Sequence, residues 1–144
     1  MEHLLVAPFK RPPMTANDQR RAHWAVVRKA KQEVGDTVFW LARRAGIKDL
    51  GPSVVSFLWY TPTRRATDSD SLGPFVKGAL DGLVRAGVWP DDNSKYVKQT
   101  RMAVTDTDTK NPRIEIRIWE VGDTGIELAG AGGVPVHRPR NVLP

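Results

Sequence analysis

The sequence predicts an α+β fold in which a small mixed β-sheet packs against two helices. Three observations predict it. Residues Val54–Tyr60 carry apolar side chains on both faces, which indicates a central strand. Apolar residues recur at helical spacing in two stretches, 15–45 and 72–87. From 112 to 121, isoleucines alternate with polar side chains, as in a strand that buries one face.

The first half of the chain contains a strand and the longer helix. Residues 3–9 predict a short strand that Pro8 places at an edge or brings to its end. Thr15, Asn17 and Asp18 are N-cap candidates for one long helix that reaches about residue 45. Its predicted apolar face comprises Val27, Ala30, Val34, Val38, Leu41 and Ala45.

The second half contains the shorter helix and two further strands. Pro74 suits the first turn of this helix, and Gly87 suits its C-terminal exit. Its apolar face comprises Leu72, Val76, Ala79, Leu80 and Leu83. Residues 95–105 and 112–121 predict the two strands of a hairpin.

Composition bounds the size and environment of the protein. A chain of 144 residues suits one domain, and the absence of cysteine excludes disulfides, thiolate zinc sites and a cysteine nucleophile. We expect a cytoplasmic protein outside the membrane, because there is no apolar run of about 18 residues and no basic leader. The domain is predicted to span residues 1–121. Residues 122–144 hold 5 Gly and 3 Pro without apolar periodicity, which is typical of a flexible tail.

Charge is distributed unevenly along the chain. The net charge is +6, but residues 1–65 carry +7 and residues 66–144 carry −1. A basic surface beside an acidic cluster is what a metal-dependent phosphodiesterase needs, because the basic surface neutralises nucleic acid and the acidic pocket holds the metal.

One stretch concentrates acidic residues around the shorter helix. Asp68 and Asp70 are two positions apart, so in an extended segment both carboxylates point to one side. After the helix, we expect the chain to bring Asp91 and Asp92 back near the helix start or the strand edge beside it. Clustered carboxylates repel unless a cation compensates them, and a hard divalent cation does so with oxygen ligands. The cationic residues of this stretch include Arg64, Arg65 and Lys77.

Simpler interpretations are open for the same residues. Residues 68–71 also fit a polar loop that caps the helix. Lys77 also fits an exposed pair with Asp81 one turn later, worth about 0.3–0.5 kcal/mol. A second Asp-x-Asp, at 106–108, lacks the glycine and glutamate of a calcium loop, and turn chemistry explains it.

The acidic stretch resembles the RusA family of Holliday-junction resolvases, small endonucleases that cut four-way DNA junctions. The family pattern is a basic run, Asp-x-Asp-Asn-Leu, a helix with Lys-x-x-x-Asp, then Ala-Gly and an Asp-Asp pair. The matching residues are Arg64-Arg65, Asp68-Ser69-Asp70-Ser71-Leu72, Lys77 with Asp81, Ala86-Gly87 and Asp91-Asp92. Ser71 stands where the family usually has Asn, and the gap from Asp70 to Lys77 is longer than in the shortest members. The element order matches over residues 1–121 and the specific motifs over 64–92.

The resemblance implies a Mg²⁺-dependent endodeoxyribonuclease of phage or prophage type, in which Mn²⁺ can replace Mg²⁺. Asp68, Asp70 and Asp92 would hold the metal and act in catalysis with Lys77, and Asp91 is the less favoured of its pair. The implied partners are branched DNA and a second copy of the chain, since a two-fold dimer suits two symmetric cuts. The residues expected to contact DNA are Arg64, Arg65, Lys10, Arg11, Arg20 and Arg21.

Two other functions remain open. A metal-dependent nucleotide phosphohydrolase would use the carboxylates but would not need the basic first half. A non-catalytic DNA-binding protein would use the basic surface but would not need the carboxylates.

Overall fold

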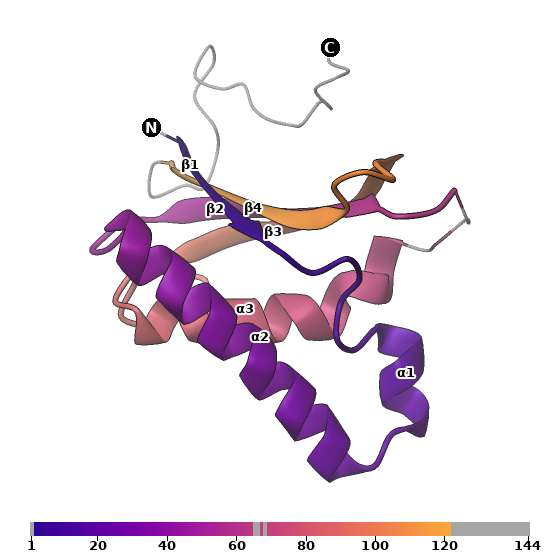
Figure 1. Cartoon of the computed structure of the whole chain (residues 1–144). Coiled ribbons are helices and arrows are strands. Elements are labelled where there is room, and N and C mark those ends of the chain that lie inside the picture. The colour runs from indigo at the N-terminus through magenta and orange to yellow at the C-terminus, as the bar shows by residue number, and fades with distance from the viewer. Residues whose placement is uncertain (1, 65–66, 68, 122–144) are drawn as a thin grey trace.

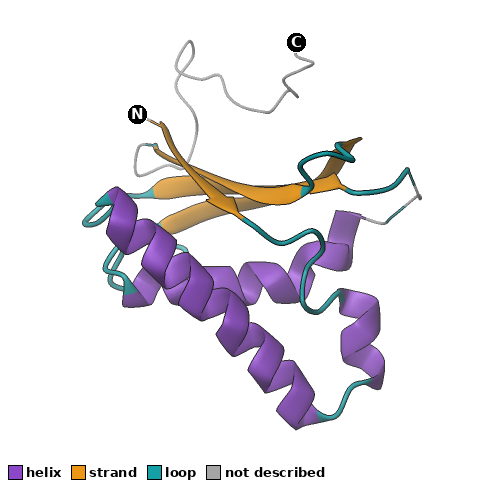
Figure 2. Cartoon of the chain, viewed as in Figure 1, coloured by secondary structure: helices purple, strands orange, loops and turns teal. Residues whose placement is uncertain are grey.

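The computed structural model of this protein describes residues 2–64, 67 and 69–121, with only the backbone of residues 69 and 70. Two layers make up the fold: a four-stranded sheet and, against one face of it, the helices α2 (Trp24–Ala45) and α3 (Gly73–Arg85) (Figures 1 and 2). The predicted α+β class with a small mixed sheet is confirmed. The predicted tail, 122–144, lies outside the described residues.

The sheet contains β1 (Glu2–Ala7), β2 (Ser53–Thr61), β3 (Val97–Thr107) and β4 (Arg113–Glu120) in the order β1-β4-β2-β3. β2 is an inner strand, as its apolar run predicts. The isoleucines of β4, at positions 114, 116 and 118, are all fully buried, so the predicted alternation is confirmed.

The predicted hairpin is wrong. β3 and β4 both form, but β2 lies between them, parallel to β3 and antiparallel to β4. β4 pairs with β2 from Ser53 opposite Glu120 to Tyr60 opposite Arg113 and also pairs with β1 on its other side. β4 is therefore an inner strand whose isoleucines are buried in the core against the helices, whereas β3, with its many polar side chains, takes the edge.

The predicted long helix is two helices. A short helix α1 (Ala16–Arg21) precedes α2, and the chain is extended at the C-cap Ala22 and the N-cap His23. The His23 imidazole accepts a hydrogen bond from the backbone N–H of Ala25 at 3.1 Å and so caps α2 with a side chain that is not among the usual N-cap residues. On α2 itself, Val34 and Val38 are buried as predicted, but Ala42 is buried in place of the exposed Ala45. No helix in the described part of the chain is both long and apolar enough to cross a membrane.

Glycines let α2 and α3 cross closely. A Cβ on Gly82 would collide with the backbone carbonyl of Gly35, and a Cβ on Gly78 would lie 3.0 Å from the carbonyl of Lys31. The crossing brings Phe75 of α3 against Phe57 of β2, with ring centroids 6.2 Å apart and an edge-to-face geometry. The core therefore lies between the two helices and the sheet.

Candidate functional site

The segment that carries the predicted carboxylates follows β2. β2 ends at Thr61, and a 3₁₀ turn, η1 (Ser69–Leu72), leads directly into α3. Asp70 lies within η1, so the predicted extended geometry is wrong at this residue. The strand stops before it because Pro62 cannot donate to a strand ladder. Asp68 and Arg65 lie outside the described residues, and so does the side chain of Asp70.

A polar cleft of about 600 Å³ opens beside η1. α1, the end of β2 and the segment that leads into η1 contribute its walls, and its lining includes Arg11, Thr15, Asn17, Arg20, Thr61, Thr67 and Ser71. Two of the predicted DNA-contacting residues, Arg11 and Arg20, thus meet in one cleft, and both are exposed. Exposed guanidinium, hydroxyl and amide groups are the usual partners of phosphate oxygens.

Three other predicted cations lie on segments that border this cleft but do not line it. Arg21 is exposed in the last turn of α1, and Arg64 is exposed on the loop beyond β2. Lys10 is held at the same end of the sheet, because its carbonyl accepts a hydrogen bond of 2.9 Å from the indole N–H of Trp59 on β2. The basic run that starts at Lys10 is therefore anchored to a buried strand residue.

A capping box fixes the cleft wall at α1. The Thr15 hydroxyl accepts from the backbone N–H of Asp18, and the Asp18 carboxylate accepts from the backbone N–H of Thr15, both at 3.1 Å. The Thr15 N–H lowers the pKa of Asp18 below its ordinary value, and the Arg11 guanidinium, 3.3 Å away, lowers the pKa further. Asp18 therefore stays ionised and holds Arg11 at the mouth of the cleft.

Asp92 lies at the opposite end of the sheet from Asp70. Backbone hydrogen bonds join Leu50 to Val88 at 2.9 Å and Ser53 to Tyr96 at 2.7 Å, so the chain around Asp92 is tied to the start of β2. Asp70 follows the end of β2, and the 13 residues of α3, about 20 Å of helix, lie between Asp70 and Asp92 along the chain. The predicted return of Asp92 to the helix start is therefore wrong within one chain. Trp89 explains the difference, because its burial and its 3.2 Å hydrogen bond to Ser53 hold the turn at the far end.

Asp91 and Asp92 have different surroundings. The Asp91 carboxylate accepts from the backbone N–H of Asp92 at 2.8 Å and from the Asn93 side-chain amide at 3.0 Å. It is exposed and closes a local turn, whereas Asp92 is partly buried. Among the described residues, no hydrogen bond to the Asp92 carboxylate is found. This difference favours Asp92 over Asp91 as the carboxylate that is open to a ligand.

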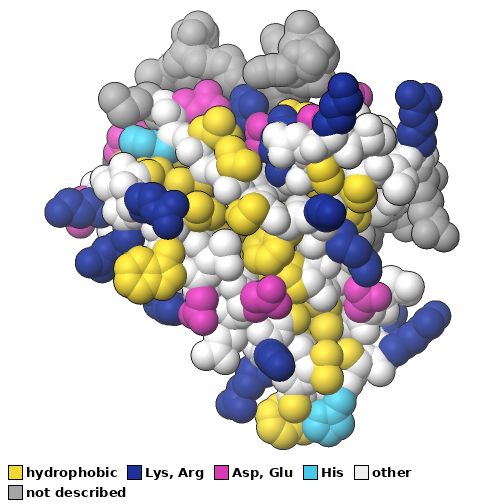
Figure 3. Space-filling view, viewed as in Figure 1, with side chains coloured by type: hydrophobic (Ala, Val, Ile, Leu, Met, Phe, Trp, Pro, Cys, Tyr) yellow, Lys and Arg dark blue, Asp and Glu magenta, His cyan; other side chains and the backbone are white. Residues whose placement is uncertain are grey.

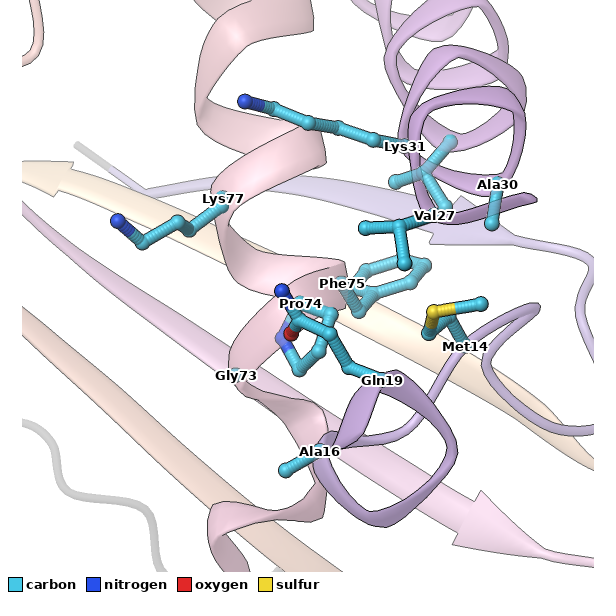
Figure 4. A pocket seen from close by; sticks show the side chains of 11 residues that line it. Met14, Ala16, Gln19, Val27, Ala30, Lys31, Gly73, Pro74, Phe75 and Lys77 are labelled. Atoms are coloured by element: carbon cyan, nitrogen blue, oxygen red, sulfur yellow. The ribbon is translucent and has the colours of Figure 1, made fainter. Parts of the chain in front are cut away.

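Lys77 lies on the exposed side of α3, beside an apolar groove of about 420 Å³. Met14, Val27, Pro74 and Phe75 line this groove between α1, α2 and α3, and Lys31 and Lys77 extend from it (Figure 4). The simpler interpretation of Lys77 as the partner of Asp81 is wrong, because in the described structure Asp81 pairs with Lys31 at 3.3 Å and forms no ion pair with Lys77. Lys77 is thus an exposed cation within two turns of η1.

The second Asp-x-Asp is a structural turn, as predicted. The Asp108 carboxylate accepts from the backbone N–H of Asn111 at 3.1 Å and from the Arg113 guanidinium at 2.9 Å. The Asn111 N–H is the main cause of the lowered pKa of Asp108, and Arg113 adds to it. The backbone N–H of Asp108 donates to the Thr61 carbonyl at 2.8 Å, which places this turn at the same end of the sheet as Asp70.

The described residues contain no group of three or more acidic, histidine or cysteine side chains that could hold a metal ion. Comparison of the sequence with protein-family models gives no match, and comparison with curated proteins gives no significant relative. The cleft beside η1, the two exposed arginines in it and the separation of Asp70 from Asp92 are therefore the observations on which a function must rest.

Proposed function

We propose that this protein is a Mg²⁺-dependent, structure-specific endonuclease that cuts four-way DNA junctions as a homodimer. One observation carries the proposal: Arg11 and Arg20 line a polar cleft together with Thr67 and Ser71, the residues that flank Asp68 and Asp70 in the sequence. A cationic wall beside carboxylates is suited to a phosphodiester backbone and to the metal that hydrolyses it. Such an enzyme works on DNA in the bacterial cytoplasm, and Mn²⁺ is expected to replace Mg²⁺.

Each group has a role in this proposal. Arg11, Arg20 and Arg64 bind phosphates on either side of the cut and set the register of the DNA. Carboxylate oxygens are the ligands that Mg²⁺ prefers, and the bound metal supplies an activated water and neutralises charge on the reacting phosphate. Lys77, an exposed cation on the first turns of α3, binds the phosphate at the cut or steadies the carboxylates.

The metal site that we propose needs two chains. Asp70 lies at the η1 end of α3 and Asp92 beyond its other end, so one chain does not bring these two residues together. In a two-fold dimer, a contact between the η1 end of one chain and Asp92 of the partner subunit occurs twice. The two sites are then equivalent, which suits paired cuts in a two-fold junction.

The outer edge of β3 offers a way to form this dimer. β3 is an edge strand of 11 residues, in which Val97 at the start pairs with Ser53 and Thr107 at the end pairs with Thr61. It therefore runs from the Asp92 end of the sheet to the η1 end. Antiparallel pairing of this edge with the same edge of a second chain would place opposite ends beside each other, as the shared site requires.

The test uses a synthetic four-way junction and a duplex of matched sequence, with Mg²⁺, with Mn²⁺ or with EDTA. The wild-type protein should cut the junction at symmetric positions with either metal and leave the duplex intact. Asp70→Asn should abolish cleavage but bind the junction as tightly or more tightly, because a negative charge near phosphate is removed. Asp91→Asn, which alters the carboxylate that closes a local turn, is the matched control and should keep most of the cleavage.

The outcomes separate the three functions. Junction binding without cleavage under either metal would mean a non-catalytic DNA-binding protein. Hydrolysis of mononucleotides by a protein that is monomeric in light scattering, both free and with junction DNA, would mean a phosphohydrolase. Wild-type cleavage by Asp70→Asn would remove this carboxylate from the chemistry.

A further inference from the structure

The N-terminal half of α2 carries an exposed tryptophan in a strongly basic setting. The Trp24 side chain is 65% exposed, although tryptophan is usually well buried in folded proteins. Between Asp18 and Glu33 the chain contains five Lys or Arg and no acidic residue. This end of α2 extends away from the sheet and from α3 (Figure 1). Figure 3 shows hydrophobic and histidine side chains together at its tip, with Lys and Arg nearby.

Aromatic and cationic groups lie close together at this tip. The Arg28 guanidinium lies 5.4 Å from the centre of the Trp24 ring, and the His23 ring centre lies 5.4 Å from the indole ring, tilted by 34°. Arg28 follows Trp24 by one helical turn, so both side chains project from the same side of α2. The Trp24 indole, the His23 imidazole and the Arg28 guanidinium are planar groups that together form one surface.

We propose that this surface, Trp24 with His23 and Arg28, stacks on unpaired bases of nucleic acid. Every base offers a flat face, and aromatic and guanidinium groups in a positively charged groove are the usual means of binding single strands. The five cations provide charge complementarity to the backbone, and Lys31 alone among them forms an ion pair in the described structure. The inference rests on the proposed function, because base pairs at the branch point of a four-way junction open and unstack more easily than those within a duplex.

The position of Trp24 fits such a role. α1 contributes to the cleft beside η1, and Trp24 follows the end of α1 by three residues. The 6 residues of α1 and this link span at most about 20 Å, so Trp24 lies within a few nucleotides of the cleft. Bases near the branch point can therefore stack on Trp24 while the strand beyond them enters the cleft.

A membrane surface explains the tip less well than nucleic acid does. Interfacial helices bury a continuous apolar face. Here Trp24 and Val26 are the strongly exposed large apolar residues of this half of α2, while Val27 lines the groove against α3. The cations lie on several sides of the tip instead of on one polar face.

The test compares two exposed tryptophans of one helix. Trp40 is 63% exposed, but residues 33–45 of α2, which contain it, hold two acidic and two basic residues. Binding of a labelled thymine oligonucleotide, a matched duplex and a four-way junction is measured by fluorescence anisotropy in EDTA. Trp24→Ala should weaken single-strand and junction binding roughly tenfold and duplex binding much less, since stacking on a base is lost. Trp24→Phe should keep most of the affinity, and Trp40→Ala should match the wild type.

Salt dependence and cleavage make the test specific. Trp24→Ala should leave the slope of log K against log salt unchanged, because no phosphate contact is removed. Equal losses of affinity from Trp24→Ala and Trp40→Ala, or unchanged single-strand binding by Trp24→Ala, would overturn the proposal. Vesicles of anionic phospholipid serve as a further probe, and a Trp24→Ala variant that loses affinity for these vesicles alone would also overturn it. Because binding is measured without metal, failure of the nuclease proposal leaves this result intact, and failure of stacking leaves wild-type cleavage intact.

Discussion

The two ends of β2 differ in how the chain is closed around them. At the start of the strand, backbone hydrogen bonds tie Asp49 and Leu50 to Gly87 and Val88, both at 2.9 Å, and Trp89 is 1% exposed. At the end of the strand, a polar cleft separates α1 from η1. We call these the closed end and the open end. Hydrogen bonds also hold the open end, such as that from the Asp108 N–H to the Thr61 carbonyl at 2.8 Å, but there exposed side chains of Arg11, Asn17 and Arg20 line a cleft.

The two parts of α2 also differ in how they are packed. From its middle to its C-terminal end, α2 packs Val34, Val38 and Ala42 into the core. Its first ten residues extend beyond α3 beside the open end, and none of them is fully buried. One helix therefore serves the core with one half and presents cations to solvent with the other.

The largest expected effect tests whether the two ends meet in a dimer. Asp70→Asn changes the open end and Asp92→Asn the closed end, and each variant alone should be inactive on junctions. Mixed subunits should regain about a quarter of the wild-type sites, because half of the dimers are then mixed and each of these has one intact site. These dimers should nick one strand and leave the junction unresolved, as seen on denaturing gels with each strand labelled.

A control for subunit exchange completes this experiment. Wild type mixed with Asp70→Asn should also produce single nicks, which shows that exchange occurs. If that control nicks while the double mixture stays inactive, each site lies within one chain and the shared-site proposal is wrong.

The next effect concerns stability at the helix crossing. Gly82→Ala forces a Cβ against the Gly35 carbonyl, so we expect the free energy of unfolding to fall by about 1–3 kcal/mol. At the open end, a Cβ on Gly73 would have nothing within 4 Å, so Gly73→Ala should leave stability unchanged or raise it by up to about 1 kcal/mol. Urea denaturation measures both. Equal losses would show that the crossing is not closer-packed than the start of α3.

The sequence predicted the fold more fully than the site, and particular residues show why. The apolar run of β2 and the isoleucines of β4 depend on burial, which periodicity reports directly. The break between α1 and α2 was missed because no Gly or Pro marks it and a histidine is the cap. The hairpin was predicted wrongly because alternation in β3 and β4 does not say which strand inserts between them.

The candidate site depends on how segments far apart in the sequence are placed in the fold. Arg11 and Arg20 were predicted from charge and resemblance, but Asn17 and Thr15 were read only as capping residues, and α1 is what brings them into the cleft. The expected meeting of Asp92 with Asp70 failed because spacing along the chain does not say where Trp89 packs. Trp24 carried a signal in its sequence, a large aromatic residue between basic pairs, that the predicted single helix concealed.

A smaller effect is expected on junction binding, in which the cations of the two ends are compared. Arg11→Ala with Arg20→Ala should weaken junction binding and flatten the slope of log K against log salt by about 0.9 for each lost phosphate contact. Arg64→Ala with Arg65→Ala should do the same. Arg43→Ala with Arg44→Ala, in the last turn of α2 at the closed end, is the control of equal charge and should leave the slope nearly unchanged. If all three pairs have equal effects, binding follows net charge and not the cleft.

The smallest effect concerns the capping box that holds α1 at the open end. The Thr15 N–H holds the pKa of Asp18 below its ordinary value, so the ionised carboxylate stabilises the fold above the unfolded pKa of about 3.9, and this contribution is lost as the pH falls through the folded pKa. Asp18→Asn removes the charge, and at pH 7 the free energy of unfolding should fall by less than about 1 kcal/mol. The difference from wild type should shrink below about pH 4, where the unfolded carboxyl begins to take up a proton, and should disappear once the pH is below the lowered pKa of the folded carboxyl.

Denaturant titrations at pH 7 and at several lower values measure this dependence on pH. Asp106→Asn, which removes an exposed carboxylate at the end of β3, corrects for the general loss of one negative charge from a protein of net charge +6. A difference between Asp18→Asn and wild type that stays constant into acid would mean that Asp18 acts through its shape and not its charge. Junction binding by Asp18→Asn should change little, because loss of the ion pair at 3.3 Å that holds Arg11 at the cleft is offset by removal of a negative charge near phosphate. The capping of this six-residue helix should therefore affect stability more than it affects the binding surface of the open end.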